Sequence, residues 1–204
     1  QHAVERPELG LDAAVGLLAE ELEVDVDRVE KGLRRIAPVV SGSVEVGDTL
    51  LLDDGLISMQ VQAVRGGQVY CLVENGGTLF DRKGLNLRGG GLSVAGLAEH
   101  DRPHIELAAR IGADFVAVSF VSDASDIEHA RSLLREAGSH AALVAKIERM
   151  EAIDNLPEIC EVSDAIMVAR GDLGVEIGDE ELPGLQKHII RTAIAHNRIV
   201  ATAT

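Results

Sequence analysis

The chain has 204 residues, 46% of them hydrophobic and 26% charged, which is typical of a folded globular protein and not of a disordered one. Its formal net charge of −15 argues against nucleic acid as a partner, because phosphate binding requires clustered lysines and arginines. No apolar stretch approaches the ~18 residues that a membrane helix needs, so the sequence predicts no membrane span.

Residues 1–43 are predicted to be a helical segment of unknown role. Apolar residues recur at helical spacing in two successive runs: Leu11, Val15, Leu18 and Leu22, then Val29, Leu33 and Ile36. Pro38 is expected to end the second run, because proline cannot continue a helix. The segment carries no motif that indicates a chemical function.

Residues 44–88 are expected to form a small antiparallel β unit. Apolar and polar residues alternate from Ile57 to Ala63, which is the period of a half-buried strand. Turn signals rich in glycine separate the predicted strands: Asp54-Gly55, Gly66-Gly67 and Asn75-Gly76-Gly77. Three glycines, Gly89 to Gly91, then indicate a hinge-like connection to the rest of the chain.

Residues 89–204 are predicted to alternate helices and strands in the order βαβαβαβ, which requires a parallel sheet. The predicted strands are Phe115 to Phe120, Ala142 to Ile147, Ala165 to Ala169 and Ile199 to Ala203. The first of these strands is almost continuously apolar, a pattern typical of strands buried on both faces.

Polar residues follow these apolar strands where each strand ends: Ser119, Lys146 with Glu148, Gly171 with Asp172, and Thr204. Lys146 and Glu148 are two apart, so both side chains are expected on one face of the strand. Carboxylates can hold a divalent metal, and a lysine beside them can stabilise an oxyanion substrate next to that metal. Barrels and Rossmann-like sheets both bind ligands at carboxyl strand ends, but no Gly-rich dinucleotide loop follows these strands, so a (β/α)8 barrel is favoured.

Each of these residues also has a purely structural interpretation. Lys146 and Glu148 could form an internal ion pair, and Asp172 could cap a helix. Thr204 could simply favour a strand, and Lys83 could be a solvated charge in a hairpin. The two cysteines, Cys71 and Cys160, stand in apolar runs, which predicts buried thiols and suits a reducing cytoplasm.

Five segments resemble pyruvate kinase, in the order and at the spacing of that family, between about residue 44 and residue 204. They are Leu50 to Ile57, Arg82 to Leu87, Ala117 to Phe120, Ala145 to Arg149 and Ile166 to Glu176. The run Met-Val-Ala-Arg-Gly-Asp-Leu-Gly-Val-Glu is the most specific of them. The resemblance implies an α/β fold, a partial (β/α)8 barrel (residues 89–204) with an inserted antiparallel β-barrel lid (residues 44–88).

The resemblance also implies roles in phosphoryl transfer from phosphoenolpyruvate to ADP, a step of glycolysis. Lys146 would stabilise charge on the moving phosphoryl group, and Glu148 and Asp172 would hold Mg²⁺ or Mn²⁺. The amides of Gly171 and Asp172 would bind the substrate carboxylate, with Ser119 nearby. Thr204 would lie near the carbon that is protonated to give pyruvate.

Lys83 would reach the phosphates of ADP or ATP from the lid. By the same resemblance, the parent protein would be a cytoplasmic homotetramer that also uses K⁺. The barrel strands that carry the potassium site and an arginine of the family have no counterpart in residues 1–40, and only about four of the eight strands are recognised. The sequence stops inside an apolar strand pattern, so we expect a piece of a longer protein that is inactive alone and has open, apolar sheet edges.

Two other functions are compatible with the same residues. A metal-dependent pyruvate or phosphoenolpyruvate lyase on a related barrel would use the same metal–enolate chemistry without a nucleotide. The lid with Lys83 argues against it, since cleaving a C–C bond requires no nucleotide clamp. A truncated, non-catalytic paralogue acting as an interaction module is the alternative outside enzymes.

Overall fold

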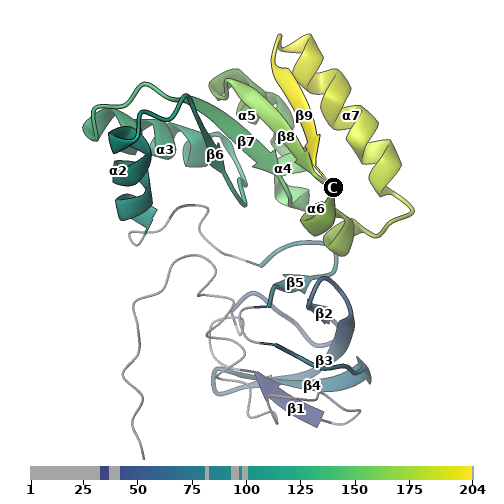
Figure 1. The fold of residues 1–204 in the computed structure, drawn as a ribbon. Coiled ribbons are helices and arrows are strands. Elements are labelled where there is room, and N and C mark those ends of the chain that lie inside the picture. The colour runs from purple at the N-terminus through teal and green to yellow at the C-terminus, as the bar shows by residue number, and fades with distance from the viewer. Residues whose placement is uncertain (1–32, 37–41, 81–82, 93–96, 98–100, 204) are drawn as a thin grey trace, which may run out of the picture.

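The computed structural model describes residues 33–36, 42–80, 83–92, 97 and 101–203, which form two separate β-sheets, the second with helices packed on it (Figure 1). The first sheet is antiparallel with five strands, and the second is parallel with four. No helix in the described part of the chain is long and apolar enough to cross a membrane.

The antiparallel sheet has the strand order β1-β4-β3-β2-β5. Its strands are β1 (Leu33–Ile36), β2 (Thr49–Leu52), β3 (Ile57–Arg65), β4 (Gln68–Asn75) and β5 (Leu85–Leu87). The predicted alternation is confirmed, because Ile57, Met59 and Val61 of β3 are buried in the core of this sheet. Gly66 and Gly67, both with positive φ, make the tight turn between β3 and β4.

The prediction of a helix through Leu33 and Ile36 is wrong. Residues 33–36 form strand β1, which pairs with β4 from Leu33 opposite Leu72 to Ile36 opposite Val69. Three apolar residues at helical spacing are a weak signal, and pairing along an existing strand outweighs such a local preference. The rest of the predicted helical segment, residues 1–32 and 37–41, lies outside the described residues.

The parallel sheet confirms the predicted βαβαβαβ order. Its strands β6 (Phe115–Val118), β7 (Ala142–Ile147), β8 (Ala165–Ala169) and β9 (Ile199–Ala203) lie side by side in chain order. The helices are α2 (Arg102–Arg110), α3 (Ala124–Glu136), α4 (Met150–Asp154), α5 (Leu156–Val162), α6 (Arg170–Ile177) and α7 (Leu182–Ala195). Among them, α3, α5 and α7 contact one another in sequence and cover the sheet.

Only one face of the parallel sheet is fully buried. Leu143, Ala145 and Ile147 of β7 pack into the core shared with the helices, while the alternate positions, including Lys146, are only partly buried. The expectation that the strand beginning at Phe115 is buried on both faces is therefore wrong. Phe115 is 61% exposed and Ile199 is 71% exposed, because β6 and β9 are the two edge strands of this sheet. The prediction of apolar sheet edges is confirmed.

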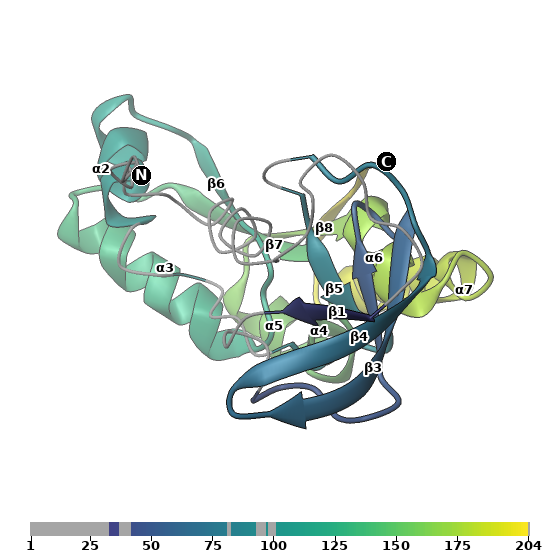
Figure 2. The same cartoon turned by 90° about the horizontal axis from the view of Figure 1, so that it is seen from below.

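The segment from Gly89 to Leu92 begins the connection between the two sheets. Figure 2 shows the molecule from the side of the antiparallel sheet. The segment follows β5, and β5 in turn contacts α6. All three glycines have positive φ, a conformation that glycine adopts without steric cost.

Candidate functional site

Ser119, Lys146 and Glu148 meet at the carboxyl ends of β6 and β7. Lys146 Nζ donates a hydrogen bond to Ser119 Oγ over 2.9 Å and lies 2.6 Å from Glu148 Oε1. The two charged side chains therefore share one face, as their spacing predicts. The ion pair between them is common to the functional and the structural interpretation, so it does not separate the two.

Glu148 is almost completely removed from solvent, with 1% of its surface exposed. Its second oxygen, Oε2, accepts a hydrogen bond of 2.7 Å from the backbone N–H of Phe120. The pKa of Glu148 is raised, chiefly because burial disfavours the carboxylate; the negative charge of Asp172 raises it further, and the contacts with Lys146 and Phe120 lower it. A buried carboxylate under these opposing influences is typical of a functional centre.

Phe120 contributes its backbone and not its side chain. It has φ of +54°, a left-handed conformation that is uncommon for a residue with a side chain and costs on the order of 1 kcal/mol. This conformation accompanies an N–H that is directed at Glu148. Sequence reasoning missed this donor, because a backbone N–H leaves no signature in the residue type.

Asp172 and Gly171 lie in the first turn of α6, which begins directly after β8. The structural alternative for Asp172 is wrong, because the residue before the helix is Ala169. The first N–H groups of a helix have no partner within it and favour an anion. Gly171 is exposed, and a side chain on it would meet nothing within 4 Å, so this helix end is open to a ligand.

Lys83 is not part of this group. Lys83 lies just before β5 in the antiparallel unit, where its Nζ is 2.7 Å from Asp53 Oδ1. Its hydrogen bond and charge interaction with Asp53 raise the pKa of Lys83. Lys83 is therefore ion-paired, not the freely solvated charge of the structural alternative. Thr204 lies outside the described residues.

The carboxylates of Glu148 and Asp172 are of the ligand type that a small divalent cation prefers. Mg²⁺ is usually held by one or two carboxylates and completes its coordination with water and substrate oxygens. The repulsion between Glu148 and Asp172 is what a bound cation would relieve. Within the described residues, no three or more His, Cys, Asp or Glu side chains are grouped so that they could hold a metal ion.

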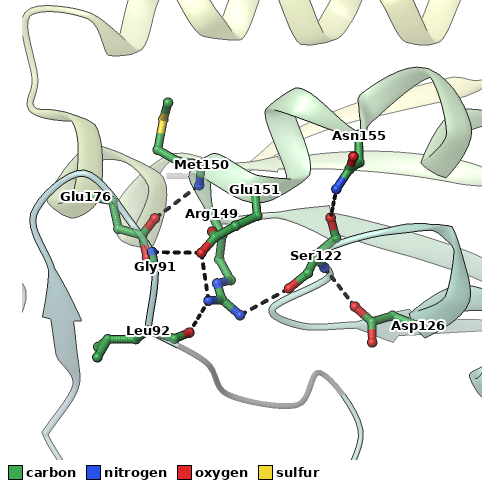
Figure 3. A network of polar contacts seen from close by, with 9 residues as sticks. All are labelled: Gly91, Leu92, Ser122, Asp126, Arg149, Met150, Glu151, Asn155 and Glu176. Atoms are coloured by element: carbon green, nitrogen blue, oxygen red, sulfur yellow. Dashed lines mark hydrogen bonds and ion pairs between the residues drawn. The ribbon is translucent and has the colours of Figure 1, made fainter. Parts of the chain in front are cut away.

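Three further charged residues, Arg149, Glu151 and Glu176, form a network beside this site (Figure 3). Arg149 and Glu176 are among the buried charged residues, with exposures of 5% each. Both lie in the segments that resemble pyruvate kinase, but the sequence alone indicates no role for them. The available signal was their position, since each ends a run that also carries a predicted site residue.

Comparisons with known proteins agree with the sequence motifs. Residues 23–204 match the family model "Pyruvate kinase, barrel domain". The match begins at residue 23, so it includes residues 23–43 of the segment to which the sequence assigned no role.

Several curated relatives are similar along most of the chain. A pyruvate kinase of Buchnera aphidicola (subsp. Acyrthosiphon pisum) is 52% identical over 163 residues, which are 78% of this chain and 34% of that protein. A pyruvate kinase of Haemophilus influenzae is 51% identical over 161 residues, with the same two shares. One of Geobacillus stearothermophilus is 45% identical over 170 residues, 82% of this chain and 29% of that protein.

The chain thus spans about a third of the length of these relatives. The family model covers well over half of the chain, and the quoted motifs fall inside the matched range. The chain belongs to the pyruvate kinase family.

Proposed function

We propose that this chain carries part of the active site of a pyruvate kinase, which transfers the phosphoryl group of phosphoenolpyruvate to ADP and releases pyruvate and ATP. One observation carries the proposal: Ser119, Lys146 with the buried Glu148, and Asp172 lie at or just after the ends of three adjacent parallel strands, which an ion pair between Lys146 and Glu148 alone does not require. Asp172, at the end of the next strand, is close enough to affect the pKa of Glu148. Family membership supplies the reaction that this arrangement would serve.

In this proposal, Lys146 stabilises negative charge on the phosphoryl group as it moves. Its ammonium group is oriented before substrate arrives, because Ser119 and Glu148 fix its position. Phosphoryl transfer depends on positioning and electrostatic stabilisation more than on covalent participation by the protein. Mg²⁺ held by Glu148 and Asp172 would neutralise charge on the substrate oxygens and bring them together.

The amino end of α6 would bind the carboxylate of phosphoenolpyruvate. The N–H groups of Gly171 and Asp172 stand in the first turn of this helix, where an anion is stabilised both by hydrogen bonds and by the helix dipole. Thr204, which follows β9, would lie near the carbon that is protonated to form pyruvate. Ser119 would both contact substrate and hold Lys146.

The two sheets would correspond to two parts of the family's catalytic unit. The chain order β6-β7-β8-β9 is that of a (β/α)8 barrel, so we assign residues 89–204 to part of such a barrel. Residues 44–88 would be part of a lid that brings Lys83 to the nucleotide phosphates. Its separate sheet and the glycine-rich connection support this assignment.

The family also suggests the setting of the reaction. We propose Mg²⁺ or Mn²⁺ as the divalent cofactor, K⁺ as a second cation bound by residues other than those described, and a homotetrameric parent protein in the cytoplasm. The free thiols of Cys71 and Cys160, both buried, are compatible with that compartment.

The reaction can be tested in the full-length protein that carries these residues. Phosphoenolpyruvate and Mg²⁺ are incubated with and without ADP; the nucleotides and phosphoenolpyruvate are followed by ³¹P NMR and pyruvate by ¹H NMR. The proposal predicts ATP and pyruvate in equal amounts, and none without ADP. Consumption of phosphoenolpyruvate without ADP would favour the lyase. Absence of turnover under both conditions would favour a non-catalytic paralogue.

A further inference from the structure

The connection between the two sheets is held in place by polar groups of the parallel-sheet unit (Figure 3). The N–H of Gly91 donates to Glu151 Oε1 over 2.7 Å, and the N–H of Gly89 donates to the backbone oxygen of Glu176 over 3.0 Å. The carbonyl of Leu92 accepts a short hydrogen bond from Nη2 of Arg149. Within residues 89–92 of the connection, Gly89, Gly91 and Leu92 are thus bonded to elements that surround the strand-end site.

Arg149 links this connection to two other segments. Its Nη2 also donates to Glu151 Oε1 over 3.1 Å, and its Nη1 donates to Ser122 Oγ over 3.1 Å. Ser122 belongs to the loop between β6 and α3 and also accepts a bond from Asn155 Nδ2 at its carbonyl oxygen. A guanidinium offers five donors in a fixed plane, so few other side chains could make these contacts together.

Two carboxylates flank the middle of the connection. Glu176 Oε2 accepts from the N–H of Met150 over 3.1 Å, whereas Glu151 Oε2 is buried without a hydrogen-bond partner in the described part of the chain. A Cβ on Gly90 would lie 3.4 Å from each of these oxygens and 3.1 Å from Met150 Cβ. Gly90 also has φ of +82°, so glycine is required here for space and for backbone conformation.

Burying the charged groups of this network costs free energy, which indicates that the network has a role beyond packing. Burial, with a smaller contribution from the charge of Glu151, raises the pKa of Glu176. A buried polar network of this kind stabilises one arrangement over others, because every alternative leaves charged groups unpaired. The arrangement selected here is the path of residues 89–92, and with it the orientation of β5 against α6.

We propose that Arg149, Glu151 and Glu176 form a clamp on residues 89–92 that sets the orientation of the antiparallel sheet over the strand-end site. The three are positioning residues: the side chains of Arg149 and Glu151 and the backbone oxygen of Glu176 bond to the connection, and the side chain of Glu176 bonds to the N–H of Met150 beside it. The clamp itself is independent of the proposed reaction. The consequence of the clamp for activity rests on the proposed function, because the clamp would place Lys83 where a nucleotide can be bound. Loosening the clamp should therefore weaken ADP binding more than phosphoenolpyruvate binding.

The test uses the full-length protein with Arg149→Met, which keeps much of the side-chain length and removes all donors. Hydrogen exchange at the amide of Gly91 should become faster by about tenfold, the change expected for losing one hydrogen-bond network contact with a charged group. Spin labels at Glu74→Cys on β4 and Glu128→Cys on α3, both exposed sites, should show a broader distance distribution. Cys71 and Cys160 are buried and should remain unlabelled, and any exposed cysteine elsewhere in the full-length protein is replaced by serine before labelling.

Two further variants keep the test decisive. Glu151→Gln retains Oε1 as an acceptor and gives the buried Oε2 position a donor, so it should exchange no faster than the parent protein. Glu151→Ala removes both side-chain oxygens, so the amide of Gly91 should exchange faster than in the parent protein. This variant replaces Arg149→Met in the test if Arg149→Met does not fold. Glu136→Gln, which removes the carboxylate charge of the exposed pair with Arg102, is the matched control and should change neither readout.

Unchanged exchange and an unchanged distance distribution in Arg149→Met, or in Glu151→Ala where the former does not fold, would overturn the clamp. In steady-state kinetics of the same variant, the KM for ADP should rise several-fold over the parent value, while the KM for phosphoenolpyruvate should stay within about twofold. Loss of the exchange protection with equal changes in both KM values would contradict the positioning role. Failure of the protein to use ADP at all would count against the proposed reaction and leave the exchange and distance results to judge the clamp.

Discussion

Replacing Lys146 by methionine separates the structural from the catalytic part of the strand-end site. Lys146 is the ion-pair partner of Glu148, which is 1% exposed at its side chain. Removing one partner of a buried ion pair costs about 3–5 kcal/mol, and we expect the lower end, about 3 kcal/mol. The reason is that 26% of the Lys146 side chain is exposed and that the N–H of Phe120 still stabilises Glu148.

The same substitution should lower turnover by roughly 10²–10³, the effect of losing one preorganised electrostatic contact. The double variant Lys146→Met, Glu148→Gln removes the unpaired buried charge, so it should regain most of the stability and none of the activity. Stability is measured by urea unfolding and turnover by pyruvate formation in the full-length protein. Lys187→Met, an exposed lysine on α7, is the control and should alter neither. Parental stability and near-normal turnover in Lys146→Met would show that Lys146 neither stabilises the buried Glu148 nor takes part in catalysis.

Three other predictions follow from the same structure. Because the pKa of Glu176 is raised above its ordinary 4.5, the folded state binds this proton more tightly than the unfolded state, and the unfolding free energy falls as pH rises from about 4.5 through the raised pKa. Glu176→Gln should reduce that slope in urea unfolding measured across pH, and identical slopes would contradict the assignment. Leu143→Ala, at a fully buried position of β7, should lower the unfolding free energy by about 2–5 kcal/mol; a loss below 1 kcal/mol would show that this core is loosely packed. Lys83→Met should raise the KM for ADP with little change in that for phosphoenolpyruvate, and equal effects on both would remove Lys83 from the nucleotide site.

The parts of the fold that leave a periodic pattern were predictable from the sequence. The strand from Ala142 to Ile147 has the bounds of β7, because an apolar run between a glycine-terminated helix and a charged residue has few other interpretations. Strand β1 was missed, because its partner β4 lies more than 30 residues away in the sequence and local spacing carries no record of that pairing. The exposed face at Phe115 was missed for a similar reason, since an apolar run does not tell an edge strand from a central one.

The candidate site likewise contains residues that the sequence predicts and contacts that it does not predict. Lys146, Glu148 and Asp172 were predictable, because each is a charged residue directly after an apolar run. The N–H of Phe120 and the clamp of Arg149 were not, because both depend on where the backbone turns after a strand ends. Burial decides the role of Arg149, and the sequence of a strand end does not show burial.

We propose that Glu148 and Asp172 act together as one metal site beside Lys146. This proposal is tested most directly by Mn²⁺ titration of the full-length protein with phosphoenolpyruvate present, followed by electron paramagnetic resonance of free Mn²⁺. Glu148→Gln and Asp172→Asn are each expected to weaken Mn²⁺ binding by about tenfold or more, since even changes around metal ligands typically cost 10–100-fold. Glu128→Gln, an exposed carboxylate on α3, should bind as the parent does. Parental affinity in both site variants would contradict the account.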